Sequence, residues 1–202
     1  MHTSFRRFPP PGEIAKELLK IEQIADVEVI DPLFDGFTSG RFFPPKLWGE
    51  RAIILREPGY RAFARNLRER LGSGYAAILY YIGFEMGANY FSAHKKVAGE
   101  SFENLVKLSE AMFMQVGFGI LKWIKIDTVG GLVIARVWDS FECELFKGGN
   151  EPSSHFIRGM LAGWASRLLE KEVSAVEVKC IAMGDPYCEF YIKGSSFKRK
   201  YG

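Results

Sequence analysis

The chain has 202 residues, 48% of them hydrophobic and 14% aromatic, so it can bury one substantial core. Lys plus Arg number 27 and Asp plus Glu 24, and this near balance argues against a nucleic-acid-binding protein. The only cysteines are Cys143, Cys180 and Cys188, an odd number that disfavours a disulfide scaffold and favours a reducing, cytoplasmic location.

The N-terminal part predicts an appendage rather than a domain with its own core. Residues 1–12 contain arginines and three prolines and no apolar stretch typical of a secretory signal. We expect a helix over 13–23, a short strand over 27–30, and a loop over 31–45 that is rich in Pro, Gly and Phe. We place the boundary of this appendage at residues 1–48, and expect its exposed aromatic side chains to pack on a partner.

Helical periodicity dominates the next part of the chain. After a short strand over 51–56, apolar spacing predicts helices over 58–71, 75–97 and 101–114, with Ser101 as the N-cap of the last. The stretch 74–93 is mostly apolar, but it contains Glu85, Asn89 and several tyrosine hydroxyls. We therefore expect a buried core helix there and no membrane span.

From residue 117 onward, the spacing of apolar residues changes from the helical period of 3.6 to the strand period of 2. Two strands are predicted over 117–126 and 132–137, the second continuing through 138–143, and Pro152 opens a helix that runs from His155 to Glu170. The stretch 173–194 alternates, breaks at Gly184-Asp185-Pro186 and alternates again, which predicts a hairpin. This order of elements predicts an α+β fold with helices packed on a small antiparallel sheet.

Two glycine pairs lie on predicted helices at a spacing of four residues. They are Gly83 with Gly87, and Gly159 with Gly163. Glycine in a helix costs about 1 kcal/mol relative to alanine. We expect the pairs to allow close approach of the helix backbone to a sheet or another helix.

The hairpin carries the strongest chemical signal. Cys180 and Cys188 lie on its two arms and can meet one metal ion, because opposed strand residues have Cβ atoms about 4.5–5.5 Å apart. Glu177 has the opposite strand parity to Cys180, so a bulge is needed to bring it to the same side. Cys143 and His155 are the remaining candidate ligands. Ordinary buried cysteines are the alternative, and a redox pair is disfavoured because Cys-x-x-Cys is absent.

No catalytic constellation is evident. Gly-x-Ser-x-Gly, Walker A and dinucleotide-binding patterns are absent, and His94 at the end of an apolar helix is expected to be exposed or capping. Aromatic residues on segments that can face one another instead suggest an apolar ligand pocket, with a filled aromatic core as the alternative. The candidates for ligand binding are Phe84, Phe113, Phe118, Trp138 and Trp164, and Trp123 lies among them.

The motifs Glu177-x-x-Cys180 and Gly184-Asp185-Pro186-x-Cys188, preceded by Gly159-x-x-x-Gly163, resemble the 4-vinyl reductase domain family. The resemblance covers roughly residues 50–194. It implies a fold like that of TRAPP subunits and of nitric-oxide-signalling domains, with residues 49–194 as the ligand-binding domain and 195–202 as a basic tail.

The resemblance also implies site residues. Sensor domains of this family hold zinc with a Glu-x-x-Cys-x₇-Cys set, which Glu177, Cys180 and Cys188 match, plus a cysteine before the glycine-bearing helix. That position is Ser154 here, so Cys143 or His155 would have to substitute. Trp138 resembles the pocket tryptophan of these sensors, but no histidine occurs at 110–113, where their hydroxyl-anchoring histidine would fall.

We therefore expect a zinc-containing homodimer that binds a hydrophobic or aromatic small molecule as a sensor or regulatory module, rather than an enzyme. One alternative is a reductase or an accessory protein of tetrapyrrole synthesis, which only the family name suggests. The other is a TRAPP-like protein-interaction subunit.

Overall fold

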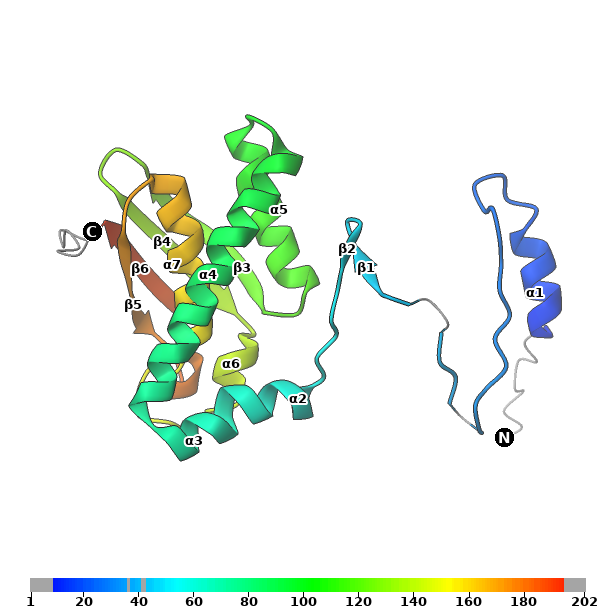
Figure 1. Ribbon diagram of the computed structural model, residues 1–202, viewed down its shortest axis with the longest axis horizontal. Coiled ribbons are helices and arrows are strands. Elements are labelled where there is room, and N and C mark those ends of the chain that lie inside the picture. Colours follow the sequence, from blue (N-terminus) through cyan, green and yellow to red (C-terminus); the bar gives the residue numbers. More distant parts are fainter. Residues whose placement is uncertain (1–8, 36, 41–42, 195–202) are drawn as a thin grey trace, which may run out of the picture. The chain divides into compact units, whose positions relative to one another are not determined.

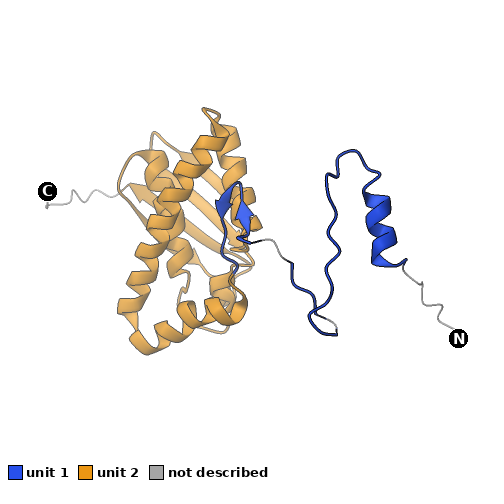
Figure 2. Ribbon diagram, turned by 45° about the vertical axis from the view of Figure 1, so that its right-hand side comes forward, with its two compact units in different colours: residues 1–54 blue, residues 55–202 orange. Residues whose placement is uncertain are grey.

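The computed structural model describes residues 9–35, 37–40 and 43–194. The chain divides into two compact units, residues 1–54 and 55–202 (Figure 2). The boundary expected after Trp48 falls a few residues before this division. The basic tail predicted over 195–202 lies outside the described residues.

The first unit has little regular structure. It contains helix α1 (Pro11–Leu18) and a two-stranded ribbon of β1 (Lys46–Leu47) and β2 (Glu50–Arg51). The strand expected over 27–30 does not form, and the one expected over 51–56 forms only at its first residue. A short alternating stretch needs a neighbouring strand to satisfy its backbone groups, and among the described residues neither 27–30 nor 52–56 is paired with a strand.

The second unit begins with helices. The chain runs through α2 (Glu57–Arg61), the π-helix η1 (Ala62–Asn66), α3 (Leu67–Leu71), α4 (Ser73–Ala98) and α5 (Phe102–Gln115). The Ser101 side chain accepts a hydrogen bond from the Asn104 backbone N–H at 3.2 Å, so the predicted N-cap of α5 is confirmed. None of the described helices is long and apolar enough to cross a membrane.

A four-stranded antiparallel sheet follows, in the order β3-β4-β6-β5. Its elements are β3 (Ile120–Asp127), β4 (Leu132–Trp138), α6 (Phe141–Glu144), α7 (His155–Leu169), β5 (Val173–Lys179), the 3-10 helix η2 (Ile181–Met183) and β6 (Cys188–Gly194). Helices α7 and α4 lie on one side of this sheet (Figure 1). The α+β class, with helices packed on a small antiparallel sheet, is confirmed.

The glycine pairs mark the crossing of α4 and α7. A Cβ atom at Gly87 would overlap the carbonyl oxygen of Met160, and one at Gly163 would overlap that of Phe84. Gly83 and Gly159 meet the opposite backbone in the same way. Two helices therefore approach backbone to backbone, as expected from the sequence, and α7 becomes the buried layer between α4 and the sheet.

The second strand of the first hairpin ends sooner than predicted. Strand β4 stops at Trp138, and Asp139 has a left-handed backbone with φ of 50°. The Ser140 side chain then accepts a hydrogen bond from the Cys143 backbone N–H and caps the short helix α6. Cys143 is therefore helical rather than part of a strand, which turns its side chain toward the later hairpin.

Candidate metal centre and apolar cavity

Four side chains gather at the end of the C-terminal hairpin. One ligand atom from each of Cys143, Glu177, Cys180 and Cys188 lies within 4.8 Å of the others, and all four residues are buried. The Cys143 Sγ atom lies 3.4 Å from the Sγ atoms of both Cys180 and Cys188. The set of three thiols and one carboxylate matches the donor chemistry that tetrahedral zinc sites use.

The hairpin geometry brings three of these residues together. The pairing of β5 with β6 shifts register between Glu177 and Lys179, which is the bulge that the strand parity of Glu177 requires. Cys180 follows β5 directly, and its backbone N–H donates to the Asp185 carboxylate at 2.8 Å. Gly184 takes a φ of 96° at the turn, and Cys188 begins β6.

The acidic groups of this cluster shift one another's pKa values. Hydrogen bonds to Cys180 and Cys188, together with burial, raise the pKa of the Cys143 thiol. Hydrogen bonds with Cys143 and Cys188 lower the pKa of the Cys180 thiol to about 2. Burial, and then the negative charge of Cys180, raise the pKa of Glu177 to about 8. A divalent cation would favour the deprotonated form of all four ligands.

Ser154 and His155 occupy different positions relative to this cluster. The Ser154 Oγ atom lies 2.8 Å from the Cys143 Sγ atom, and the Ser154 backbone N–H donates to the Glu177 carboxylate at 3.0 Å. His155 does not belong to the group of four. Its Nδ1 atom lies 3.5 Å from the Arg158 guanidinium, and burial lowers its pKa to about 4. Of the two candidate substitutes for the missing cysteine, the structure brings Cys143 into the cluster.

A second buried carboxylate, that of Glu142, precedes Cys143 in the chain and contacts the start of α7. Glu142 has no exposed surface and accepts hydrogen bonds from the backbone N–H groups of Phe156 and Ile157, both at 2.9 Å. Burial raises its pKa to about 7, although these hydrogen bonds oppose the shift. Glu142 thus caps α7 in place of the Ser154 side chain, which makes no capping hydrogen bond. No sequence pattern indicated this role.

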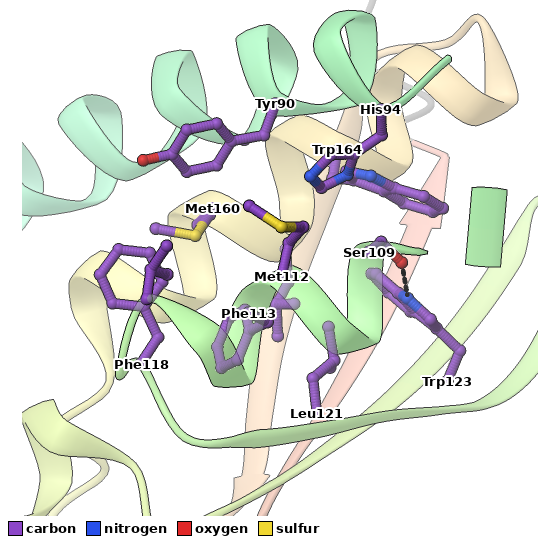
Figure 3. A pocket seen from close by; sticks show the side chains of 13 residues that line it. Tyr90, His94, Ser109, Met112, Phe113, Phe118, Leu121, Trp123, Met160 and Trp164 are labelled. Atoms are coloured by element: carbon purple, nitrogen blue, oxygen red, sulfur yellow. Dashed lines mark hydrogen bonds between the residues drawn. The ribbon is translucent and has the colours of Figure 1, made fainter. Parts of the chain in front are cut away.

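An apolar cavity lies between helices α4, α5 and α7 and strand β3. Its volume is about 50 Å³. Thirteen residues line it (Figure 3), and none of them is charged at neutral pH. Its apolar wall includes Met112, Phe113, Phe118, Leu121 and Met160.

The hydroxyl group of Tyr90 lies at one end of the cavity, and four side chains with polar atoms lie at the other (Figure 3). There the Trp123 indole donates to the Ser109 hydroxyl at 2.9 Å and stacks on Trp164 with ring centres 4.6 Å apart. His94 lies beside them with 7% of its surface exposed, so the expectation of an exposed or capping histidine is wrong. Gly87, Tyr90 and His94 follow helical spacing on the buried face of α4, and that periodicity was the available signal.

The predicted ligand-binding residues divide into two groups. Phe113, Phe118 and Trp164 line the cavity. Phe84 instead packs against the core near Tyr80, with ring centres 6.4 Å apart, and Trp138 faces Tyr187 at 5.4 Å and borders a separate surface depression. The sequence did not single out His94 or Ser109 for the cavity. The two lie on different helices, and only the packing of α5 on α4 brings them to one wall.

Comparison with known families identifies the hairpin region. The model of the 4-vinyl reductase domain family matches residues 133–194, which include all four residues of the cluster. The chain contains a 4-vinyl reductase domain. The resemblance expected from the Glu-x-x-Cys and Gly-Asp-Pro motifs is therefore confirmed.

Two uncharacterised proteins of Methanocaldococcus jannaschii are similar to the chain around this 4-vinyl reductase domain. One is 30% identical over 122 residues, which are 60% of this chain and 66% of that protein. The other is 23% identical over 128 residues, or 63% of this chain and 70% of that protein. The aligned part thus spans about two thirds of each relative.

Solved structures share the fold of the 4-vinyl reductase domain and the helices before it. The phenol-responsive sensory domain of the transcription activator PoxR has a TM-score of 0.63 and 22% identity, covering 72% of this chain and 78% of that one. A vinyl-4-reductase family protein from M. jannaschii has a TM-score of 0.50 and 23% identity, covering 72% and 85%. A trafficking protein particle complex subunit 3 from Naegleria fowleri, covalently bound to palmitic acid, has a TM-score of 0.50 and 13% identity. The match covers 71% of this chain and 95% of that one.

Proposed function

We propose that this protein is a binding module for a small hydrophobic or aromatic molecule, built around a structural zinc site. The observation that carries the proposal is the cavity between α4, α5, α7 and β3, whose lining is almost entirely apolar. The likeness of the fold to the PoxR sensory domain supports a sensory or regulatory role.

The cavity favours a compact ligand. A cavity of about 150 Å³ binds benzene, so an aromatic ring enters this cavity of about 50 Å³ only when the side chains of its wall move. Met112 and Met160 line the cavity, and their flexible side chains can adapt to a single ring. A long acyl chain would need far more space.

Binding of 4-fluorotoluene, followed by fluorine NMR and calorimetry, tests this proposal. Met112→Trp fills the cavity and should lower the affinity at least tenfold. Met114→Trp is the matched control, because Met114 is 57% exposed on the same helix, and it should leave binding unchanged. Absence of binding to the unmodified protein, or equal loss in both variants, would contradict the proposal.

The zinc site is supported by its donor set and its position. Cys143, Glu177, Cys180 and Cys188 would hold the ion as four protein ligands, an arrangement typical of structural rather than catalytic zinc. The ion would supply charge neutralisation and would cross-link α6 to both arms of the hairpin. Metal analysis of the purified protein should find one zinc per chain.

The predicted homodimer remains a proposal. Ile78 lies one helical turn before Tyr81 and Ile82 on α4. The three residues are 50%, 62% and 46% exposed, which leaves an apolar patch on the domain surface. Light scattering after gel filtration should give the mass of two chains, and Ile78→Glu should reduce it to one. A monomeric unmodified protein would exclude the dimer.

A further inference from the structure

The cavity is smaller than an aromatic ring requires, so part of its wall must move when such a ligand enters. Its volume is about 50 Å³, whereas a cavity of about 150 Å³ binds benzene. The flexible side chains of Met112 and Met160 can adjust the shape of the wall in place. Entry also requires an element that reaches the protein surface and whose backbone can rotate.

The connection between α5 and β3 has both properties. Val116 lines the cavity and is 41% exposed, more than any other residue of the lining, and Phe118 is partly exposed. Gly117 and Gly119 flank Phe118 with φ of 83° and 137°, a backbone region that glycine adopts readily. Apart from its chain neighbours, a Cβ atom at Gly117 would meet none of the described residues within 4 Å, but one at Gly119 would lie 2.7 Å from the Trp138 carbonyl oxygen. Phe118 therefore has a free pivot on one side and a fixed attachment on the other.

The Phe118 ring connects the cavity to α6 and to the start of α7. Its centre lies 5.5 Å from that of Phe113, which belongs to the cavity wall (Figure 3). It also lies 5.6 Å from the ring of Phe141 on α6 and 5.9 Å from that of Phe156 on α7. The Phe118 carbonyl oxygen accepts a hydrogen bond from the Phe141 backbone N–H at 3.2 Å. Because aromatic pairs depend on the distance and angle between their rings, a displacement of Phe118 changes contacts with both helices.

Phe141 and Phe156 in turn support the first helices of the second unit. Tyr60 on α2 meets the Phe141 ring edge to face, with ring centres 5.2 Å apart. Phe63 on η1 meets the Phe156 ring in the same manner at 6.2 Å. Segment η1 is a π-helix, a form that occurs frequently at functional sites. A continuous series of ring contacts therefore runs from the cavity wall to α2 and η1.

We propose that the Phe118 ring is a gate of the cavity, and that its movement on ligand binding loosens the packing of α2 and η1. This inference rests on the proposed function and adds the regulation of that same site. In the ligand-free protein the ring closes the cavity and packs on Phe141 and Phe156. A ligand displaces the ring and weakens both contacts, and with them the support for Tyr60 and Phe63. The coupling is reciprocal, so a partner that stabilises the closed packing of α2 and η1 lowers ligand affinity by the same factor.

Hydrogen exchange followed by mass spectrometry tests this proposal on the unmodified full chain. Exchange is compared at pH 7.5 with and without saturating 4-fluorotoluene. Peptides that cover residues 57–66 should exchange at least about threefold faster with the ligand, because local opening becomes easier when packing contacts are lost. Peptides that cover α7 beyond its first turn should exchange no faster. Unchanged or slower exchange over residues 57–66 would overturn the proposal.

Variants then assign the effect to the Phe118 ring. Phe118→Ala should bind 4-fluorotoluene about tenfold more tightly, since no ring has to move, and the ligand should then leave exchange over 57–66 unchanged. Phe118→Leu, which is closer in size, should tighten binding by about threefold. Phe84→Ala is the matched control, because Phe84 is also a partly buried phenylalanine but does not line the cavity. It should change the affinity by less than about threefold. Circular dichroism confirms that each variant is folded.

The outcomes distinguish this inference from the function beneath it. If 4-fluorotoluene binds but exchange over residues 57–66 does not increase, the coupling is wrong and the binding function stands. Unchanged or weaker binding in both Phe118→Ala and Phe118→Leu would also overturn the gate. If 4-fluorotoluene does not bind to the unmodified protein, the proposed function itself fails and this inference fails with it.

Discussion

The Cys143 Sγ atom lies 2.8 Å from the Ser154 Oγ atom. A cysteine at the start of α7 would therefore place its sulfur close to the position that the Cys143 sulfur occupies, and the two arrangements are alternative ways to complete one cluster. The family resemblance implies a cysteine at position 154, and this chain has a serine there with a cysteine on α6 instead.

This short distance predicts that the fourth metal ligand can be moved from position 143 to position 154. Cys143→Ser should lower the zinc content well below one per chain and lower the melting temperature by about 10 °C, since metal binding contributes directly to folding at such sites. The double variant Cys143→Ser, Ser154→Cys should recover most of both. Inductively coupled plasma mass spectrometry measures the zinc content, and calorimetry measures the melting temperature.

The neighbouring serine provides the control for this exchange. Ser153 is also buried, but its hydroxyl donates to the Glu151 carbonyl oxygen rather than to the cluster. Cys143→Ser combined with Ser153→Cys should therefore stay depleted of zinc. Full zinc content in Cys143→Ser alone would show that Cys143 is not a ligand.

The crossing of α4 and α7 predicts a large effect of one methyl group. Gly87→Ala should lower the free energy of unfolding by about 3 kcal/mol, because the new Cβ atom overlaps the Met160 backbone, which cannot move as a flexible side chain would. Gly74→Ala lies on the same helix with no atom within 4 Å of the added Cβ, and it should stabilise the protein by about 0.5–1 kcal/mol. Urea unfolding measures both, and equal effects would contradict the close crossing.

The helix crossing and the hairpin were accessible from the sequence because each depends on a local signal. Helical glycines at a spacing of four have few explanations other than close packing. Period-two alternation on both sides of Gly184-Asp185-Pro186 specifies a hairpin, and the parity of Glu177 even required the bulge found between it and Lys179.

The rest could not be predicted because it depends on contacts between distant segments. Cys143 reaches the cluster only because Asp139 turns the chain and Ser140 caps a helix of one turn, where the alternating pattern favoured a longer strand. The cavity wall combines His94, Ser109, Trp123 and Trp164 from four elements, and no local pattern specifies such a meeting. The resemblance directed attention to Trp138, which lies elsewhere.

Glu142 provides a test of the cap on α7. Glu142→Gln should destabilise the protein by about 2 kcal/mol, because the amide replaces one of two accepting oxygens with a donor that faces the N–H groups of Phe156 and Ile157. Glu144→Gln is the control on the same helix. Glu144 pairs with Lys147 in an exposed salt bridge, so its loss should cost less than about 0.5 kcal/mol. Chemical unfolding at pH 7.5 compares them, and similar values for the two variants would exclude the capping role.

His94 predicts a specific dependence of stability on pH. Burial lowers its pKa in the folded protein from 6.5 to about 4, so between these values the unfolded chain binds a proton that the folded chain does not. Stability therefore falls as the pH decreases from 6.5 to 4 and is independent of this residue above 6.5. The difference between the two pKa values corresponds to a decrease of about 3 kcal/mol in the free energy of unfolding between pH 6.5 and pH 4. Because other groups titrate there too, the quantity to measure is the difference in unfolding free energy between the unmodified protein and His94→Leu. That difference should shift against the unmodified protein by about this amount from pH 6.5 to 4. A constant difference would mean that folding does not lower the pKa of His94.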